Sequence, residues 1–203
     1  MLAALRDGQR AVAEVQGLLR GEVSLGAGAT ASSVTLPPLL AAFRRAYPGV
    51  RVRQREGNSD VLRTRLARGD IDLALLTDLG DDAGGEPWGE DELVLVGAPG
   101  LTDGPVVTFA EGSAVRQLLE RAWPDVSVAM ELGSIEAVRA HAVAGVGPAL
   151  LSAQTVAGEV ARGELVVIQR EGFPIARKLV LEHRGVERLA PAAAALRALL
   201  IDF

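Results

Sequence analysis

The segment 23–48 constrains the fold of this chain most, because it reads as a short strand, a small-residue turn and an amphipathic helix. Gly26 and Gly28 permit a sharp bend where the strand ends. Three hydroxyl side chains, of the type preferred at helix N-caps, stand where the helix is expected to begin: Thr30, Ser32 and Ser33. A helix start presents unpaired N–H groups and the positive end of a dipole, so it can hold an anion without a lysine. The segment therefore predicts one wall of a binding cleft.

Strand and helix patterns alternate along the rest of the chain. The predicted strands are 23–27, 50–55, 72–76, 93–98, 106–109, 126–130, 148–151, 165–168 and 178–183. The predicted helices are 2–20, 32–46, 59–68, 113–123, 134–144, 154–158 and 186–200. The acidic stretch 78–90 holds several glycine and proline breaks and is predicted to be a surface loop. Repeated strand–helix–strand units favour α/β architecture with a parallel sheet covered by helices.

Two clusters of glycine and proline, within 99–105 and 171–174, divide this pattern. The last helix needs a sheet to cover, and the first unit is the natural one. We therefore predict two Rossmann-like lobes joined by two crossings. Lobe I comprises 22–98 and 179–203, and lobe II comprises 99–178 with both crossings. Ligands of such folds bind outside the carboxyl ends of the strands, so we expect a cleft between the lobes.

Four corners between a predicted strand and the following helix carry small polar residues: 30–33, 57–59, 111–113 and 132–134. Any α/β protein caps helices with serine or asparagine, and capping is the better explanation for each corner alone. Two corners fall in each lobe, all on the same edge. Together they predict a pocket of hydroxyl and backbone N–H groups that would suit a carboxylate.

Composition excludes several other functions. The net charge of −5 argues against a nucleic-acid-binding surface. The chain has no cysteine and no long apolar run, so we expect a cytoplasmic protein without disulfides or a membrane span. His141 and His183 are the only histidines and lack companions at metal-ligand spacing. We therefore expect neither a metal nor another cofactor.

Catalytic patterns are also missing. Ser113 lacks the Gly-x-Ser-x-Gly elbow and evident histidine and aspartate partners, so a serine nucleophile is disfavoured. Asp70 and Asp72 are better explained by turn formation than by acid–base chemistry. Arg116 and Arg139 could reach an anionic ligand or point to solvent. We expect a sensor of a small molecule rather than an enzyme.

The order of motifs resembles the effector-binding domain of LysR-type transcriptional regulators, from about Gly21 to the end of the chain. In the first half the shared motifs are Leu25-Gly26, Leu36-Pro37, Phe43-Arg44, Tyr47-Pro48, Glu56-Gly57-Asn58-Ser59 and residues 69–74. In the second half they are residues 92–96, 133–138 and 144–147. The resemblance implies a fold like that of type 2 periplasmic binding proteins, with a small-molecule effector between the lobes.

The resemblance also implies which residues contact the effector. Thr30, seven residues before Pro37, stands where this family often contacts its ligand, and a hydroxyl residue after the second strand does the same. The second-lobe corners commonly line the same pocket. The resulting candidates are Thr30, Ala31, Ser32, Asn58, Ser59, Thr108, Phe109, Ser113, Gly133 and Ser134. Two positions depart from the family pattern, Ser152 where proline is frequent and Pro148 after Gly147.

Members of this family carry an N-terminal winged helix-turn-helix and a linker helix. Residues 1–21 resemble the end of that linker helix, so we expect the DNA reader to be absent from this chain and DNA contact to depend on it. The resemblance implies a homodimer with lobe I against the partner's lobe II, and a tetramer in the full-length regulator. The alternative is a solute-binding protein of a transporter, which has the same fold but needs an export signal.

Overall fold

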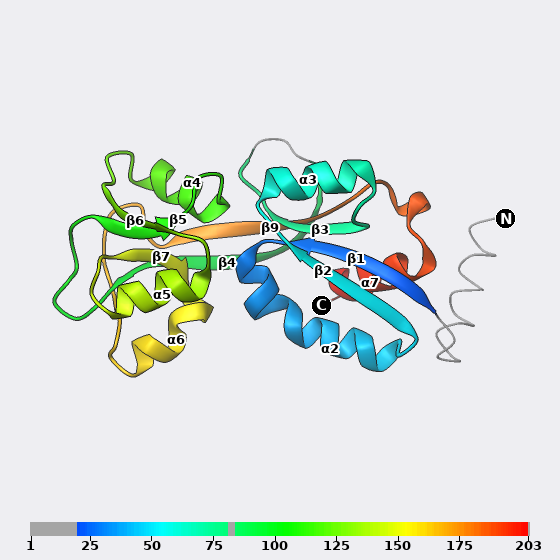
Figure 1. Ribbon diagram of the computed structural model, residues 1–203, viewed down its shortest axis with the longest axis horizontal. Helices are drawn as coiled ribbons and strands as arrows, with labels where there is room; N and C mark the ends of the chain where they lie inside the picture. Colours follow the sequence, from blue (N-terminus) through cyan, green and yellow to red (C-terminus); the bar gives the residue numbers. More distant parts are fainter. Residues whose placement is uncertain (1–19, 81–83, 203) are drawn as a thin grey trace.

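The computed structural model describes residues 20–80 and 84–202. Figure 1 shows two lobes lying side by side and joined by two long strands that run from one lobe into the other. Residues 2–19 of the helix predicted over 2–20 lie outside the described residues. The two-lobe arrangement expected from the sequence is confirmed.

Lobe I is a sheet between two layers of helix. Its own strands are β1 (Gly21–Ala27), β2 (Val50–Glu56) and β3 (Leu73–Thr77), and β1 pairs in parallel with both neighbours. Its helices are α2 (Leu36–Ala46), preceded by the π-helical turn η1 (Ala31–Thr35), then α3 (Ser59–Arg68) and α7 (Pro191–Ile201), preceded by the 3-10 turn η2 (Val186–Arg188).

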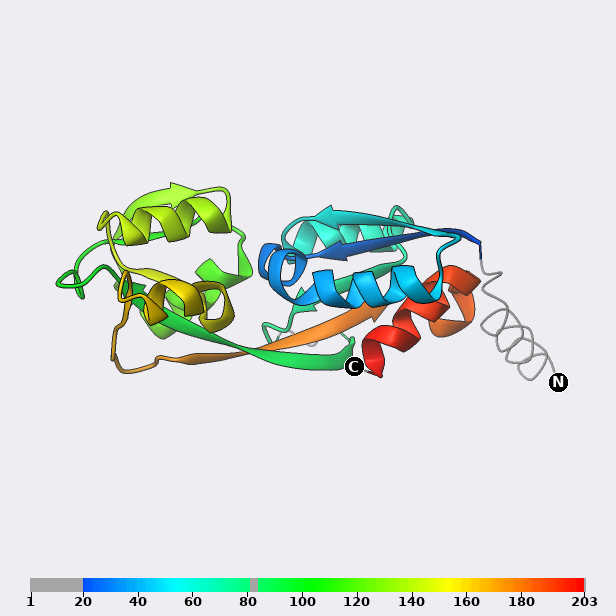
Figure 2. The same ribbon diagram turned by 90° about the horizontal axis from the view of Figure 1, so that it is seen from below.

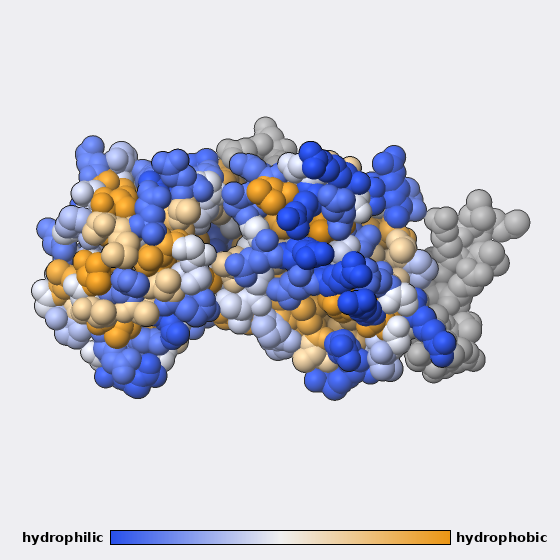
Figure 3. Space-filling model, viewed as in Figure 1, coloured by the Kyte–Doolittle hydropathy of each residue, from blue (hydrophilic) through white to orange (hydrophobic). Residues whose placement is uncertain are grey.

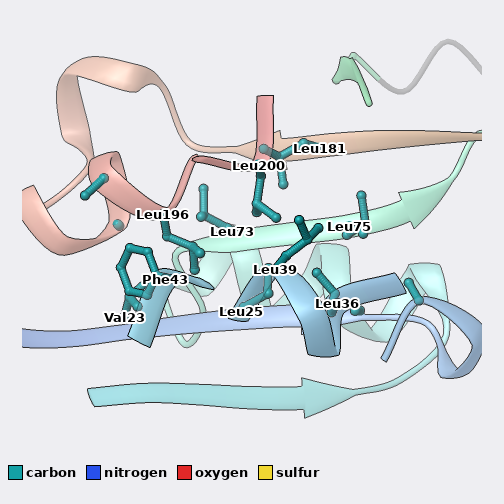
Figure 4. Close-up of a cluster of buried hydrophobic side chains, with 14 of the residues drawn as sticks. Val23, Leu25, Leu36, Leu39, Phe43, Leu73, Leu75, Leu181, Leu196 and Leu200 are labelled. Carbon is teal, nitrogen blue, oxygen red and sulfur yellow. The ribbon is translucent and has the colours of Figure 1, made fainter. Parts of the chain in front are cut away.

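The two faces of the lobe I sheet are covered by different helices. Helices α2 and α7 pack on one face, where Phe43 and Leu196 meet Leu25 of β1 (Figure 4). Helix α3 covers the other face, where Leu62 and Leu66 pack with the buried side chains Ile71, Ala74, Leu76 and Val180. Because successive strand residues point to opposite faces, the apolar run of β3 supplies both cores.

The helices of lobe I begin and end where the sequence signals place them. Pro37 and Pro38 lie in the first turn of α2, directly after the π-helical turn η1. Asn58 caps α3 through its side chain, and Gly69 ends that helix in the left-handed conformation (φ 80°). These ends fix the direction from which α2 and α3 approach lobe II.

Lobe II has its own core. Its strands are β5 (Val106–Phe109), β6 (Val128–Leu132), β7 (Ala149–Ser152) and β8 (Val166–Val167). Its helices are α4 (Ala114–Ala122), α5 (Ile135–Val143) and α6 (Ala153–Ala161). Strands β5 and β6 pair in parallel, and the helices bury one apolar cluster around Leu119, Val138 and Val156.

The lobes are joined by β4 (Glu86–Gly97) and β9 (Ile175–His183), which pair antiparallel to each other (Figure 2). At one end β9 pairs with β3, and at the other β4 pairs with β7 and β8. The hydrogen-bonded sheet is therefore continuous, in the order β2-β1-β3-β9-β4-β7, although the apolar cores of the two lobes are separate. The sheet is mixed and not wholly parallel as the strand–helix alternation suggested.

The structure places the first crossing earlier than the sequence analysis did. The sequence pattern places Leu93–Val96 in lobe I, yet they pair with Ser152–Ala149, and all but Leu95 pack in the lobe II core. The second half of the predicted acidic loop is the start of β4. Pro87 and Gly89 indicate a loop in the sequence. The strand accommodates them because the ladder has a register shift between them and this half of the strand is largely exposed.

Strand β2 forms one edge of the sheet and exposes Arg51, Arg53 and Arg55 on one face, as its alternating sequence predicts. Glu22 on β1 forms an ion pair with Arg53, in which Glu22 Oε2 lies 2.9 Å from Arg53 Nε. Figure 3 shows hydrophilic residues gathered over this strand. The edge of lobe I is therefore strongly basic although the whole chain is acidic.

Gly147, between α5 and β7, is predicted to be intolerant of a side chain. A Cβ atom there would lie 2.3 Å from the backbone oxygen of Pro105, so lobe II would have to shift. We expect Gly147→Ala to lower the free energy of unfolding by about 1–3 kcal/mol in urea denaturation. Gly89→Ala is the matched control because a Cβ at Gly89 meets nothing within 4 Å. Equal stability of the two variants would contradict this account.

Candidate functional site

The four polar corners predicted from the sequence line one cavity between the lobes. This inter-lobe cavity has a volume of about 310 Å³ and lies where the starts of α2 and α3 face those of α4 and α5 (Figure 1). Seven of the ten candidates line it: Thr30, Ala31, Asn58, Ser59, Phe109, Ser113 and Gly133. The other three, Ser32, Thr108 and Ser134, are described in the structure but are not among its lining residues.

In lobe I the two corners are built differently. Asn58 is a true N-cap, since its Oδ1 accepts a hydrogen bond from the Val61 N–H at 2.9 Å. Thr30 has helical backbone angles and makes no side-chain cap, because the helix begins with the π-helical turn. The Ser32 hydroxyl donates weakly to the Ala27 carbonyl at 3.5 Å. The expected capping by the 30–33 hydroxyls is therefore absent, and Ser32 is not a lining residue of the cavity.

In lobe II one serine caps a helix and the other lines the cavity. Ser134 Oγ accepts from the Ala137 N–H at 3.2 Å, so its hydroxyl serves α5. Ser113 precedes α4 without a side-chain cap and lines the cavity. Thr108 and Phe109 are neighbours on β5 and must point to opposite faces, which explains why only Phe109 lines the cavity.

The lobes come into contact at the cavity. A Cβ atom built on Gly112 of lobe II, whose φ is 82°, would lie 3.1 Å from the Asn58 side-chain nitrogen of lobe I. Glycine is favoured here both by its positive φ and by this close approach. The corners of the two lobes therefore face each other at contact distance on this side of the cavity.

Arg177 is a lining residue that the sequence analysis did not select. Its side chain is only 5% exposed, and it forms an ion pair with Asp91, whose side chain is 9% exposed and which lies opposite it in the β4–β9 ladder. It also donates through Nη1 to Thr30 Oγ1 at 3.4 Å, while its Nε is buried without an acceptor. Burial lowers the pKa of the Arg177 guanidinium, and the Asp91 carboxylate offsets part of that shift.

The sequence did hold a signal for Arg177. Counting by twos along β9, Arg177 shares a face with Leu179 and Leu181, so a charged residue stands in a buried row. Because the predicted strand begins at residue 178, Arg177 falls outside it and its place in the buried row is missed. A charge on the buried face of a strand needs a partner, and Asp91, which directly follows the predicted loop, supplies it.

Ser152, a departure from the family pattern, connects this ion pair to lobe II. Its hydroxyl donates to Asp91 Oδ1 at 2.9 Å, and Ser152 is 3% exposed. A chain of polar contacts thus runs from Thr30 of lobe I through Arg177 and Asp91 to Ser152, where α6 begins. Proline at 152 would have no hydroxyl for Asp91.

The other candidate polar groups have structural partners. Arg116 pairs with Glu120 and Glu131 and donates to the Phe109 carbonyl, and Arg139 pairs with Glu159; neither arginine lines the cavity. Asp72 accepts from the backbone N–H and hydroxyl of Ser24 at 2.8 and 2.7 Å, which ties β1 to the turn before β3.

Within residues 20–80 and 84–202 there is no group of three or more histidine, aspartate or glutamate side chains placed to hold a metal ion. None of the helices described is both long and apolar enough to cross a membrane.

Comparison with known proteins identifies the family. The sequence profile described as LysR substrate binding domain matches residues 16–203. The chain is 33% identical over 220 residues to the HTH-type transcriptional regulator CbbR of Xanthobacter flavus, covering 95% of this chain and 64% of that regulator's length. The chain therefore belongs to the LysR substrate-binding domain family.

Solved structures show the same fold. The regulatory domain of CcmR from Synechocystis PCC6803, in complex with 2-PG, is 25% identical, with a TM-score of 0.77 and coverage of 90% of this chain and 97% of that domain. The effector-binding domain of QuiR in complex with shikimate is 16% identical, with a TM-score of 0.74 and coverage of 91% and 97%. The predicted type 2 periplasmic-binding-protein-like fold is confirmed.

The contact between Ser152 and Asp91 can be tested by removing the hydroxyl. We expect Ser152→Ala to lower the free energy of unfolding by about 1–3 kcal/mol, because a buried carboxylate oxygen loses a donor. Ser33→Ala is the control, since the exposed Ser33 hydroxyl donates only to the carbonyl of its own helical turn. Thermal and urea unfolding report both values. A Ser152→Ala loss no greater than the control's would contradict the role of Ser152.

Proposed function

We propose that this chain is the effector-sensing domain of a LysR-type transcriptional regulator and that a small organic anion binds in the inter-lobe cavity. The observation that carries this proposal is the convergence of helix starts from both lobes on one cavity that also contains a buried arginine. Helix starts offer N–H donors and the positive ends of dipoles. Leucine, valine and phenylalanine side chains on the same walls would cover the carbon skeleton of the ligand.

The fold supplies a means of reporting occupancy. The lobes have separate cores and are joined through the β4–β9 crossing, the contacts around the cavity and a hydrogen bond from Arg121 to the Leu79 carbonyl, so a change of lobe angle leaves each core intact. A ligand that touches both lobes binds the closed form better than the open form and shifts the population toward it. Binding without turnover is sufficient for this role.

The relatives support regulation over transport. Xanthobacter flavus CbbR is a transcriptional regulator by name, and the CcmR regulatory domain binds the small molecule 2-PG. In a full-length regulator a winged helix-turn-helix outside these residues would contact DNA. A solute-binding protein of a transporter is therefore the less favoured alternative.

We also propose that the domain forms a homodimer in which lobe I faces the partner's lobe II, within a tetramer of the full-length regulator. Phe43 of α2 is fully buried in the lobe I core and cannot contribute to this interface. Leu40 on the same helix packs against that core and is only partly buried, so it can contribute. Light scattering after gel filtration should give twice the chain mass, whereas a strict monomer at high concentration would contradict the dimer.

The binding site itself can be tested with a thermal-shift screen of organic acids, amino acids and aromatic metabolites. A ligand that binds only the folded chain raises the melting temperature as its concentration increases. We expect Ser59→Trp to abolish the response to any hit, because Ser59 lines the cavity at the start of α3.

Asp60→Trp is the matched control because Asp60 is the next residue, is exposed and is not a lining residue. Its response to the ligand should equal that of the unmodified chain. A hit whose shift survives Ser59→Trp and is lost in Asp60→Trp would place the ligand elsewhere and contradict the proposal.

A further inference from the structure

We propose that Arg177 is the specificity-determining residue of the inter-lobe cavity. It selects ligands that carry one carboxylate or phosphate group, because that group accepts hydrogen bonds from the guanidinium and partly replaces Asp91 as its partner. The inference rests on the proposed function and deepens it. Arg177 recognises the charge of the ligand, and carboxylates and phosphates are the chemical class that it binds.

The first argument is the incomplete bonding of a buried guanidinium. Arginine carries five N–H donors in a fixed fork that suits carboxylate and phosphate oxygens. Arg177 donates to Asp91 and, at the long distance of 3.4 Å, to Thr30, while Nε is buried without an acceptor. An unpaired buried donor is costly, so a further acceptor on this side chain would be stabilising.

The second argument is position. Arg177 and Thr30 both line the cavity, and Thr30 stands directly before the helical turn that opens α2. The guanidinium and the start of this long helical segment therefore favour negative charge at the same place. A bound oxyanion could accept from Arg177 while lying at the positive end of the helix dipole.

The third argument limits the number of negative charges. Glu56 of lobe I and Glu111 of lobe II line the same cavity, and both are exposed to solvent. Beside the buried pair of Arg177 and Asp91, which is neutral overall, they disfavour a second anionic group near the solvent side. The arrangement suits a ligand with one anionic end at Arg177 and hydrogen-bond donors, such as hydroxyl or ammonium groups, toward Glu56 and Glu111.

The pair also couples binding to the crossing. Arg177 and Asp91 lie opposite each other on the two strands that join the lobes, and Ser152 holds the second oxygen of Asp91 from lobe II. A ligand that draws Arg177 away from Asp91 weakens the bond between the crossing strands. The energetic link between charge recognition and lobe angle therefore passes through these residues.

The test uses isothermal titration calorimetry with matched charged and neutral probes, shikimate and its methyl ester and then glycolate and glycolamide, and also with inorganic phosphate. The unmodified chain should bind at least one anionic probe and bind its neutral counterpart at least tenfold more weakly. Asp91→Asn keeps an acceptor for Ser152 and frees Arg177, so it should tighten the binding of that anionic probe.

The main variant is the double substitution Arg177→Leu with Asp91→Leu, which removes the pair without leaving a buried charge unpaired. It should weaken binding of the anionic probe by about tenfold to a hundredfold, the value of charge-assisted hydrogen bonds. The control is Arg139→Leu with Glu159→Leu, which removes another ion pair with a buried carboxylate, away from the cavity, and should leave the affinity unchanged. If the main variant does not fold, the single variant Arg177→Lys is measured in its place, and its affinity for the anionic probe should fall by about tenfold.

The outcomes separate this inference from the proposed function. Anion binding that survives the loss of Arg177 within threefold, or equal binding of the neutral counterpart, overturns the inference and leaves a ligand-sensing cavity standing. Weaker binding in Asp91→Asn also counts against it, because that result describes a purely structural ion pair. No binding of any probe by the folded, unmodified chain counts against both proposals.

Discussion

The antiparallel pairing of β4 with β9 is the interaction on which the rest of the structure depends. Each strand begins in one lobe and ends in the other, so the ladder connects the two cores and sets the distance between the facing corners. The chain places Arg177, the most buried charged residue in the described part of the chain, on this ladder, where it pairs with Asp91. Burying two charges has a desolvation cost that an apolar pair would avoid. Their presence at the crossing is consistent with a site that needs polarity there.

Much of the fold could be predicted from the sequence because local signals and global topology agree. The strand–turn–helix of 23–48, the Asn58 cap and the Gly69 stop each indicate the element that forms. The crossing was harder to place because its first strand carries charged and breaker residues in its exposed half and apolar residues in its buried half. A strand that changes lobe midway has no single hydrophobic period, so the sequence pattern places Leu93–Val96 in lobe I, whose elements come before them in the chain.

The candidate site shows a similar division. Counting small polar corners was sufficient to find the cavity, because strand ends on one edge of a sheet converge. It could not tell a hydroxyl that caps a helix from one that faces the cavity. Ser134 and Ser113 occupy equivalent corners, yet the first bonds to the Ala137 N–H and the second lines the cavity. That difference depends on side-chain orientation, which spacing alone does not determine.

The arginine-bearing strand at the border of lobe I has a consequence for solution behaviour. An edge strand offers unpaired backbone groups to any other extended chain, and a flat apolar edge strand promotes fibrous aggregation. Three guanidinium groups on successive alternate positions of β2 repel a second copy of the same strand aligned beside it. The chain therefore carries its own protection against strand-to-strand association, independent of whatever ligand occupies the interior.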